Sequence, residues 1–151
     1  MITDAPAPIS MRTSLQFEEC LGLLRQKLHR DEFRVVAQIR FDREFKNTLG
    51  VDSRKCTVLV VWNSFYAYQA LLCGVSGGLF LPFNISVSDE DGSTLITTTN
   101  HSFAGCSHGP IGVQILAREL NRRMEQILME LAVYNTVGSS SGTLAEPKEA
   151  I

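Results

Sequence analysis

The sequence predicts an α+β fold: a mixed or antiparallel sheet with helices packed mainly on one face, ending in a long C-terminal amphipathic helix. Apolar residues recur at helical spacing in some segments and at every second position in others, and these segments follow one another along the chain. The pair Asp91-Gly92, between two alternating segments, is typical of a hairpin that joins antiparallel strands. The resulting order, strand-helix-strand-helix-strand-helix-strand-strand-helix, is that of a sheet with helices stacked on it.

The first part of the chain is predicted to alternate strands with helices. A strand around Ile9 to Thr13 leads into a helix, whose start is marked by a capping-box pattern from Thr13 to Gln16. The alternating apolar residues from Phe33 to Phe41 predict a strand with one buried face. Asp42 is expected to cap a short helix that closes at Gly50. The apolar stripe of the first helix consists of Phe17, Cys20, Leu21, Leu24 and Leu28.

The middle of the chain holds the most apolar strand and a short helix directly after it. Cys56 to Trp62 is apolar and β-branched almost without a break, which predicts a central strand covered on both faces. Asn63 and Ser64 both suit the N-cap of a helix that stops before Gly74. Asn63 has two interpretations: a helix cap, which we favour, and a ligand-binding residue.

Two strands and the longest helix complete the predicted fold. The strand from Leu81 alternates apolar with polar residues, and the hairpin connects it to a strand from Thr94 to Thr99. An apolar stripe predicts the final helix from about Gly112 to Tyr134. Asn84 lies on the polar side of the first of these strands. It is either a satisfied surface residue or part of a small-molecule site.

Length and composition are those of one globular domain. The chain has 151 residues, of which 44% are hydrophobic and 20% charged, so it can bury a core and is not disordered. We expect a single α+β domain over residues 9–137, with flexible termini at 1–8 and 138–151. Fourteen Lys and Arg against sixteen Asp and Glu give a net charge of −2. Without a basic excess or stripe, we expect no nucleic-acid binding.

The sequence also predicts the compartment. Its longest strongly apolar stretch, Val58 to Trp62, is far shorter than the roughly 20 residues that span a bilayer. The first residues contain no apolar run long enough for a signal peptide. We therefore expect a cytoplasmic protein that does not enter a membrane, with free thiols rather than disulfides. Its cysteines are Cys20, Cys56, Cys73 and Cys106.

Several motifs from Phe33 to Thr99 fall in the register of a known family. They are Leu49-Gly50, the apolar strand that ends at Asn63, the run Ala67 to Leu71, and the segment Gly78 to Asn84. In these motifs the chain resembles domain of unknown function 302, a family of small bacterial and archaeal proteins. The resemblance implies a compact α+β domain that tends to dimerise, and it implies no biochemical activity, because the family's role is not established.

The segment from Asn100 to Pro110 concentrates residues that can bind metals. His101, Cys106 and His108 could supply three ligands to zinc or copper, with water as the fourth. Cys106 with either histidine as base could instead form a thiol nucleophile. We favour a third interpretation, a polar, glycine-rich connection between a strand and a helix. The prediction is therefore no metal and no cofactor, and no catalytic residue is assigned.

Together these observations favour a homodimeric module that binds a small molecule or a protein partner, rather than an enzyme. The alternative is a metal- or thiol-dependent enzyme built on His101, Cys106 and His108. An aromatic surface from Phe65, Tyr66 and Tyr68 is expected near the dimer contact. Asn63 and Asn84, together with the same His/Cys segment, are the candidate ligand-binding residues.

Overall fold

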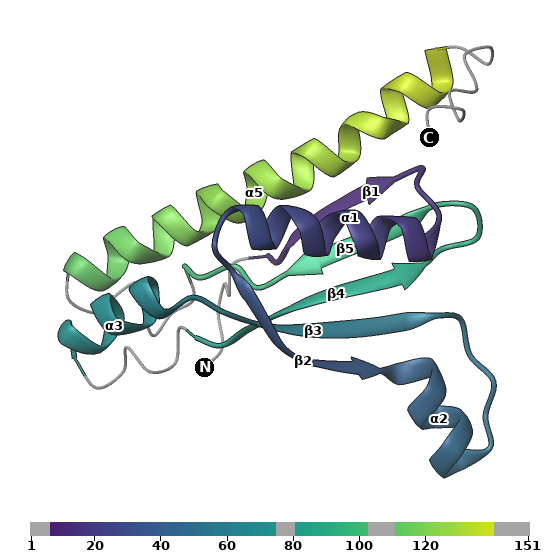
Figure 1. Cartoon of the computed structure of the whole chain (residues 1–151), viewed down its shortest axis with the longest axis horizontal. Coiled ribbons are helices and arrows are strands. Elements are labelled where there is room, and N and C mark those ends of the chain that lie inside the picture. Colours follow the sequence, from purple (N-terminus) through teal and green to yellow (C-terminus); the bar gives the residue numbers. More distant parts are fainter. Residues whose placement is uncertain (1–6, 75–80, 103–110, 141–151) are drawn as a thin grey trace.

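The computed structural model describes residues 7–74, 81–102 and 111–140, with side chains of the last helix up to residue 133. Its strands form one five-stranded sheet in the order β1-β5-β4-β3-β2, and every neighbouring pair is antiparallel (Figure 1). The α+β prediction is therefore confirmed, with a wholly antiparallel sheet. The strands are β1 (Ile9–Thr13), β2 (Arg34–Arg40), β3 (Cys56–Trp62), β4 (Phe83–Asp89) and β5 (Thr94–Thr98).

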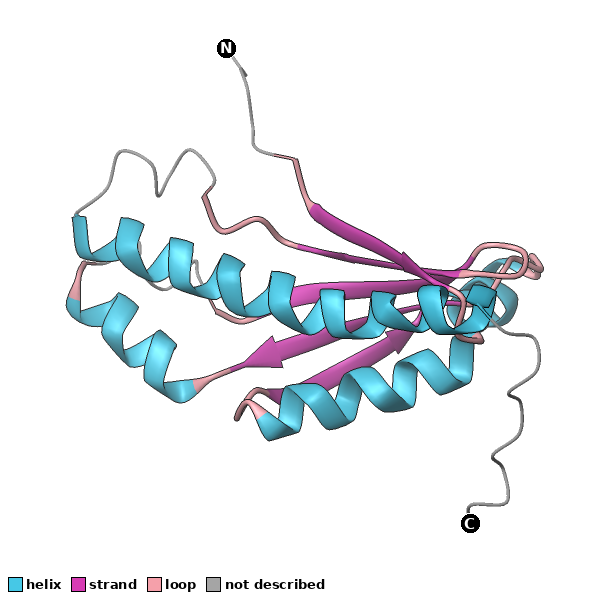
Figure 2. Ribbon diagram, turned by 90° about the horizontal axis from the view of Figure 1, so that it is seen from above, coloured by secondary structure: helices cyan, strands magenta, loops and turns pink. Residues whose placement is uncertain are grey.

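Helices cover one face of this sheet, as Figure 2 shows from above. The helices are α1 (Phe17–Arg30), α2 (Phe41–Leu49), α3 (Ser64–Leu72) and α5 (Ile111–Ser140). α1 and α5 pack against the sheet and bury the hydrophobic core between the two layers. None of the helices in the described ranges is both long and apolar enough to cross a lipid bilayer. The fully buried core residues include Leu24, Leu28, Leu59, Ile85, Ile96, Leu120, Met124 and Leu128.

Two predicted helix caps are wrong, because both side chains are used elsewhere. α1 begins at Phe17 with no side-chain cap, and the Thr13 hydroxyl instead donates to the carbonyl oxygen of Leu131 at 2.9 Å, tying β1 to α5. α2 begins at Phe41, one residue before Asp42. The Asp42 carboxylate accepts two hydrogen bonds from the Arg40 guanidinium instead. The partner of Thr13 is brought close only by the folded chain, whereas Asp42 pairs with a residue two positions before it.

β2 does not keep the single buried face that its alternating sequence predicted. A bulge shifts the register between Val35, opposite Val61, and Ala37, opposite Val60. Because one extra residue reverses the alternation, the strand presents Val35 to the helices before the bulge and Gln38 after it. Ile39 thereby faces the other side of the sheet.

β3 was predicted to be covered on both faces, and this is also wrong. Thr57, Leu59 and Val61 are fully buried under the helices, whereas Val58 and Val60 on the opposite face are only half-buried. That opposite face, called the open face below, carries no described helix apart from α2 at its edge. β3 is thus apolar also on a face that the described residues cover only in part.

Candidate functional site

A shallow groove of about 520 Å³ lies on the open face of the sheet. Its apolar half comes from β2, β3 and the first residue of α2, and contains Ile39, Phe41, Val58 and Val60. Its polar half comes from β4 and β5, and contains amide and hydroxyl groups of Asn84, Ser86, Thr97 and Thr99. No charged side chain lines the groove in the described part of the chain.

The register of the strands explains why the groove has two chemical halves. Ile39, Val58, Ser86, Thr97 and Ser10 are consecutive cross-strand neighbours, so one row crosses all five strands. The row changes from apolar to hydroxyl side chains between β3 and β4. At its polar end the hydroxyls of Ser10 and Thr97 lie 2.9 Å apart in a hydrogen bond. None of the described lining residues is titratable, so none of them can act as a general acid or base.

Of the predicted site residues that the structure describes, Asn84 alone lies in the groove. Its side chain is exposed, and its amide makes no hydrogen bond to the residues that the structure describes. The backbone carbonyl of Asn84 accepts a hydrogen bond from the Thr98 hydroxyl at 3.0 Å, which fixes its place on β4. The amide therefore remains available to a ligand, and ligand binding by Asn84 stays a prediction.

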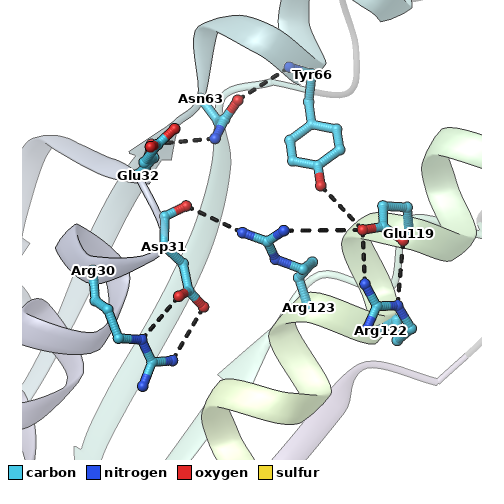
Figure 3. A network of polar contacts seen from close by, with 8 residues as sticks. All are labelled: Arg30, Asp31, Glu32, Asn63, Tyr66, Glu119, Arg122 and Arg123. Atoms are coloured by element: carbon cyan, nitrogen blue, oxygen red, sulfur yellow. Dashed lines mark hydrogen bonds and ion pairs between the residues drawn. The ribbon is translucent and has the colours of Figure 1, made fainter.

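Asn63 is a structural residue, as the favoured interpretation predicted (Figure 3). Its Oδ1 accepts from the backbone N–H of Tyr66 at 3.1 Å and caps α3. Its Nδ2 donates to the carbonyl oxygen of Glu32 at 3.2 Å, at a turn where Glu32 has φ of 67°. Asn63 is buried and both ends of its amide are used, so it links the α1–β2 turn to α3.

A polar network next to Asn63 connects α3 and α5, and sequence reasoning missed it. The Tyr66 hydroxyl donates to Glu119 at 3.3 Å, and Arg122 donates to the same carboxylate at 2.8 Å. Hydrogen bonds from Arg122 lower the pKa of Glu119, whereas burial raises the pKa of the Tyr66 phenol. Arg123 donates to the carbonyl oxygen of Asp31 at 3.3 Å (Figure 3). Glu119 and Arg123, on the polar face of α5, thus connect this helix to α3 and to the turn after α1.

Tyr66 is also buried in the core, which corrects the expectation that it belongs to an exposed aromatic surface. Its ring stacks on Phe33 at 6.1 Å, and Phe33 contacts Phe83 edge to face at the same distance. Phe65 and Tyr68 are exposed, at 64% and 60%. Only these two members of the expected aromatic surface face solvent.

Of the three metal-binding candidates in the His/Cys segment, the structure describes only His101. The His101 ring is buried and lies edge to face against Phe83, with 4.8 Å between the ring centroids. The backbone N–H of His101 donates to the Asn121 side chain at 2.8 Å, which anchors the end of the hairpin to α5. Cys106 and His108 lie outside the described residues.

The structure therefore does not bring the five predicted site residues together. Asn84 lies on the open face, whereas Asn63 and His101 lie in or beside the core on the helix side. Among the described residues, no group of three His, Cys, Asp or Glu side chains could hold a metal ion. Cys20 is buried, and burial raises the pKa of its thiol to about 11, so the thiol remains protonated at neutral pH.

Sequence reasoning also missed the groove as a whole. A signal was present: the alternate positions on the polar side of the strand from Phe83 are all uncharged, and the preceding strand is apolar on both sides. These uncharged residues are Asn84, Ser86 and Ser88. What the sequence could not show is which strands are neighbours. The antiparallel register places these two sides next to each other and creates one uncharged surface.

Comparisons with known proteins place the chain in a family. The model of the family "Domain of unknown function DUF302" matches residues 9–131. A solved structure with a similar fold is that of an uncharacterized conserved DUF302 protein from Bacillus stearothermophilus, with a TM-score of 0.75 and 22% sequence identity. The alignment covers 82% of this chain and 97% of that one, and no curated protein matches. The apolar strand ending at Asn63 and the segment ending at Asn84 are thus parts of a shared domain, and the chain belongs to the DUF302 family.

Proposed function

We propose that the chain is a cytoplasmic, homodimeric binding module rather than an enzyme, and that its groove on the open face binds a small uncharged molecule. The observation that carries this proposal is the chemistry of the groove: a floor of valines beside a wall of amide and hydroxyl groups, with no charge. Its volume of about 520 Å³ lies within the range of small-molecule sites.

The absence of charge in the groove lining determines the class of ligand. A charged molecule would lose its hydration in the groove without meeting an opposite charge, which costs several kcal/mol for an ion, on the order of what a buried unpaired charge costs in proteins. An uncharged molecule loses less on leaving water. Its apolar part would lie on Val58 and Val60, and its polar groups would exchange hydrogen bonds with Asn84, Ser86 and Thr97.

We expect Asn84→Asp to weaken binding of an uncharged probe by at least tenfold, or about 1.4 kcal/mol. The substitution keeps the shape of the side chain and adds an ionised carboxylate, which must lose water when an uncharged molecule covers it. Fluorescence titration with Nile red, an uncharged dye that brightens in apolar surroundings, measures the affinity.

The matched control is Asn47→Asp, which adds the same charge at an exposed position on α2 outside the groove. This variant should bind Nile red as the wild type does. Equal affinities for wild type and Asn84→Asp, or equal weakening in both variants, would show that the groove is not the binding surface.

The prediction of no bound metal needs its own test, because a bound metal would favour the metal-dependent enzyme over the binding module. We expect protein purified without a histidine tag to contain no stoichiometric zinc or copper, and Cys106→Ala to leave the fold and the mass unchanged. Elemental analysis by plasma mass spectrometry measures the metal. About one metal ion per chain, lost in Cys106→Ala, would instead support the site built on His101, Cys106 and His108.

A further inference from the structure

α2 carries an apolar stripe that the described chain covers only in part. None of its residues is buried, although Phe41, Phe45 and Leu49 follow at intervals of four and therefore share one side of the helix. Their exposures are 36%, 38% and 68%, and the two phenylalanine rings contact each other at 5.9 Å. In Figure 1 the helix extends beyond the sheet, away from α1 and α5. These three residues are called the α2 stripe below.

α2 is nevertheless held against α1 at its start, and a glycine cap ends it at Gly50. Arg40 donates to both carboxylate oxygens of Asp42, at 3.0 and 2.9 Å, and lies over the Phe17 ring of α1 at 5.2 Å. At its other end Gly50 adopts the left-handed conformation that terminates a helix, with φ of 68°, and its N–H donates to the Lys46 carbonyl. A nine-residue helix is marginal in water by itself, so these anchors present the stripe as a preformed projection.

The groove on the open face is also incomplete: the sheet forms its floor, and no described residue covers it from above. Sites for small molecules enclose roughly 70–90% of the ligand surface, and a single sheet face cannot do this. Phe41 belongs both to the groove lining and to the α2 stripe, so groove and stripe form one continuous apolar surface. A partly covered helix and an uncovered groove thus lie side by side on the same molecule.

We propose that the α2 stripe of a second copy of this chain lies over the groove and roofs the ligand site, each copy covering the other around a two-fold axis. This inference rests on the homodimer and the groove of the proposed function, and it names the surface that joins them. Two-fold pairing is self-complementary, so one type of contact made twice covers both grooves and both stripes. Any other partner would have to supply both an apolar element to cover the groove and an apolar surface to cover the α2 stripe.

Charge does not oppose the pairing with a second copy. The groove lining is uncharged and the α2 stripe is apolar, so their contact brings no like charges together and leaves no charge unpaired. Of the charged residues of α2, Asp42 is paired with Arg40, and Arg43, Glu44 and Lys46 have both signs and are exposed. They can remain in water while the stripe is covered.

The test compares charge substitutions on the two sides of α2. Phe45→Lys and Leu49→Lys place a charge in the stripe, and Leu49 is so exposed that its substitution leaves the monomer fold intact. Asn47→Lys adds the same charge on the other side of the helix. We expect light scattering to give a dimer for wild type and Asn47→Lys and a monomer for both stripe variants, with unchanged circular dichroism. Both monomeric variants should bind Nile red at least tenfold more weakly.

The possible contrary results separate this inference from the proposed function. A wild-type monomer at all concentrations would overturn the homodimer and this inference together. Dimers of both stripe variants, or a monomer produced only by Phe65→Lys on α3, would overturn the α2 surface and leave the homodimer standing. Monomeric stripe variants with wild-type affinity for Nile red would show that the groove binds without a roof, which also overturns the inference.

Discussion

Replacing Leu24 by alanine is expected to lower the free energy of unfolding by about 2–5 kcal/mol. Leu24 lies in the middle of α1, is fully buried, and belongs to the core between the helices and the sheet. The substitution removes apolar contacts and leaves a cavity that the surrounding layers fill only in part. Urea unfolding followed by circular dichroism, with all proteins at one concentration, measures the change.

Leu71→Ala on α3 is the matched control for this change. It deletes the same atoms from a helix, but Leu71 is 61% exposed, so little area buried in the chain is lost and stability should change by less than about 0.5 kcal/mol. A loss of similar size in both variants would mean that the layer of α1 on the sheet is not the main source of stability.

Asn63→Ala is expected to cost about 2–3 kcal/mol and to loosen α3. Alanine removes the acceptor that caps the helix at Tyr66, and it also leaves the carbonyl of Glu32 without the amide donor. Thermal and urea unfolding give the overall loss. Amide hydrogen exchange should locate it, with faster exchange in α3 than in α1.

Asn63→Asp separates the two hydrogen bonds, because a carboxylate still accepts from the Tyr66 N–H but cannot donate to Glu32. Its loss should lie between those of wild type and Asn63→Ala, at about 1–2 kcal/mol. Asn47→Ala, at an exposed position with no partner among the described residues, should have almost no effect. Equal losses for the two Asn63 variants would assign the whole effect to the contact with Glu32.

The order of the elements could be predicted from the sequence because each element depends mainly on its own residues. The stripe of α5 illustrates this: residues from Val113 to Leu131 at helical spacing are buried as the spacing predicts. The same holds for the hairpin, where Asp91 and Gly92 have the positive φ values that its turn requires. Asn63 capped its helix because donor and acceptor are three residues apart.

Most of the failed predictions depend on residues that are distant in the sequence, whereas the Asp42 cap fails because of Arg40, two residues before it. Thr13 looks like a cap until Leu131, 118 residues later, offers its carbonyl at 2.9 Å. The alternation of β2 predicts one face until its pairing with β3 introduces the bulge at Val35. The groove likewise requires Asn84 to lie opposite Val60, which only the register determines. Local patterns therefore predicted the elements, and not the surface that the paired strands create.

Val36, the extra residue at the bulge in β2, affects the direction in which α2 points, but not which residues α2 presents. β2 ends at Arg40 and α2 begins at Phe41, so the helix points where the strand aims it. A bulge bends and twists its strand. Deleting Val36 would keep every residue of α2 and of the groove in the sequence, but would turn the helix, and Phe41 with it, in another direction. Over evolution, a single-codon deletion could therefore abolish or redirect assembly in a related protein whose contact residues are all retained.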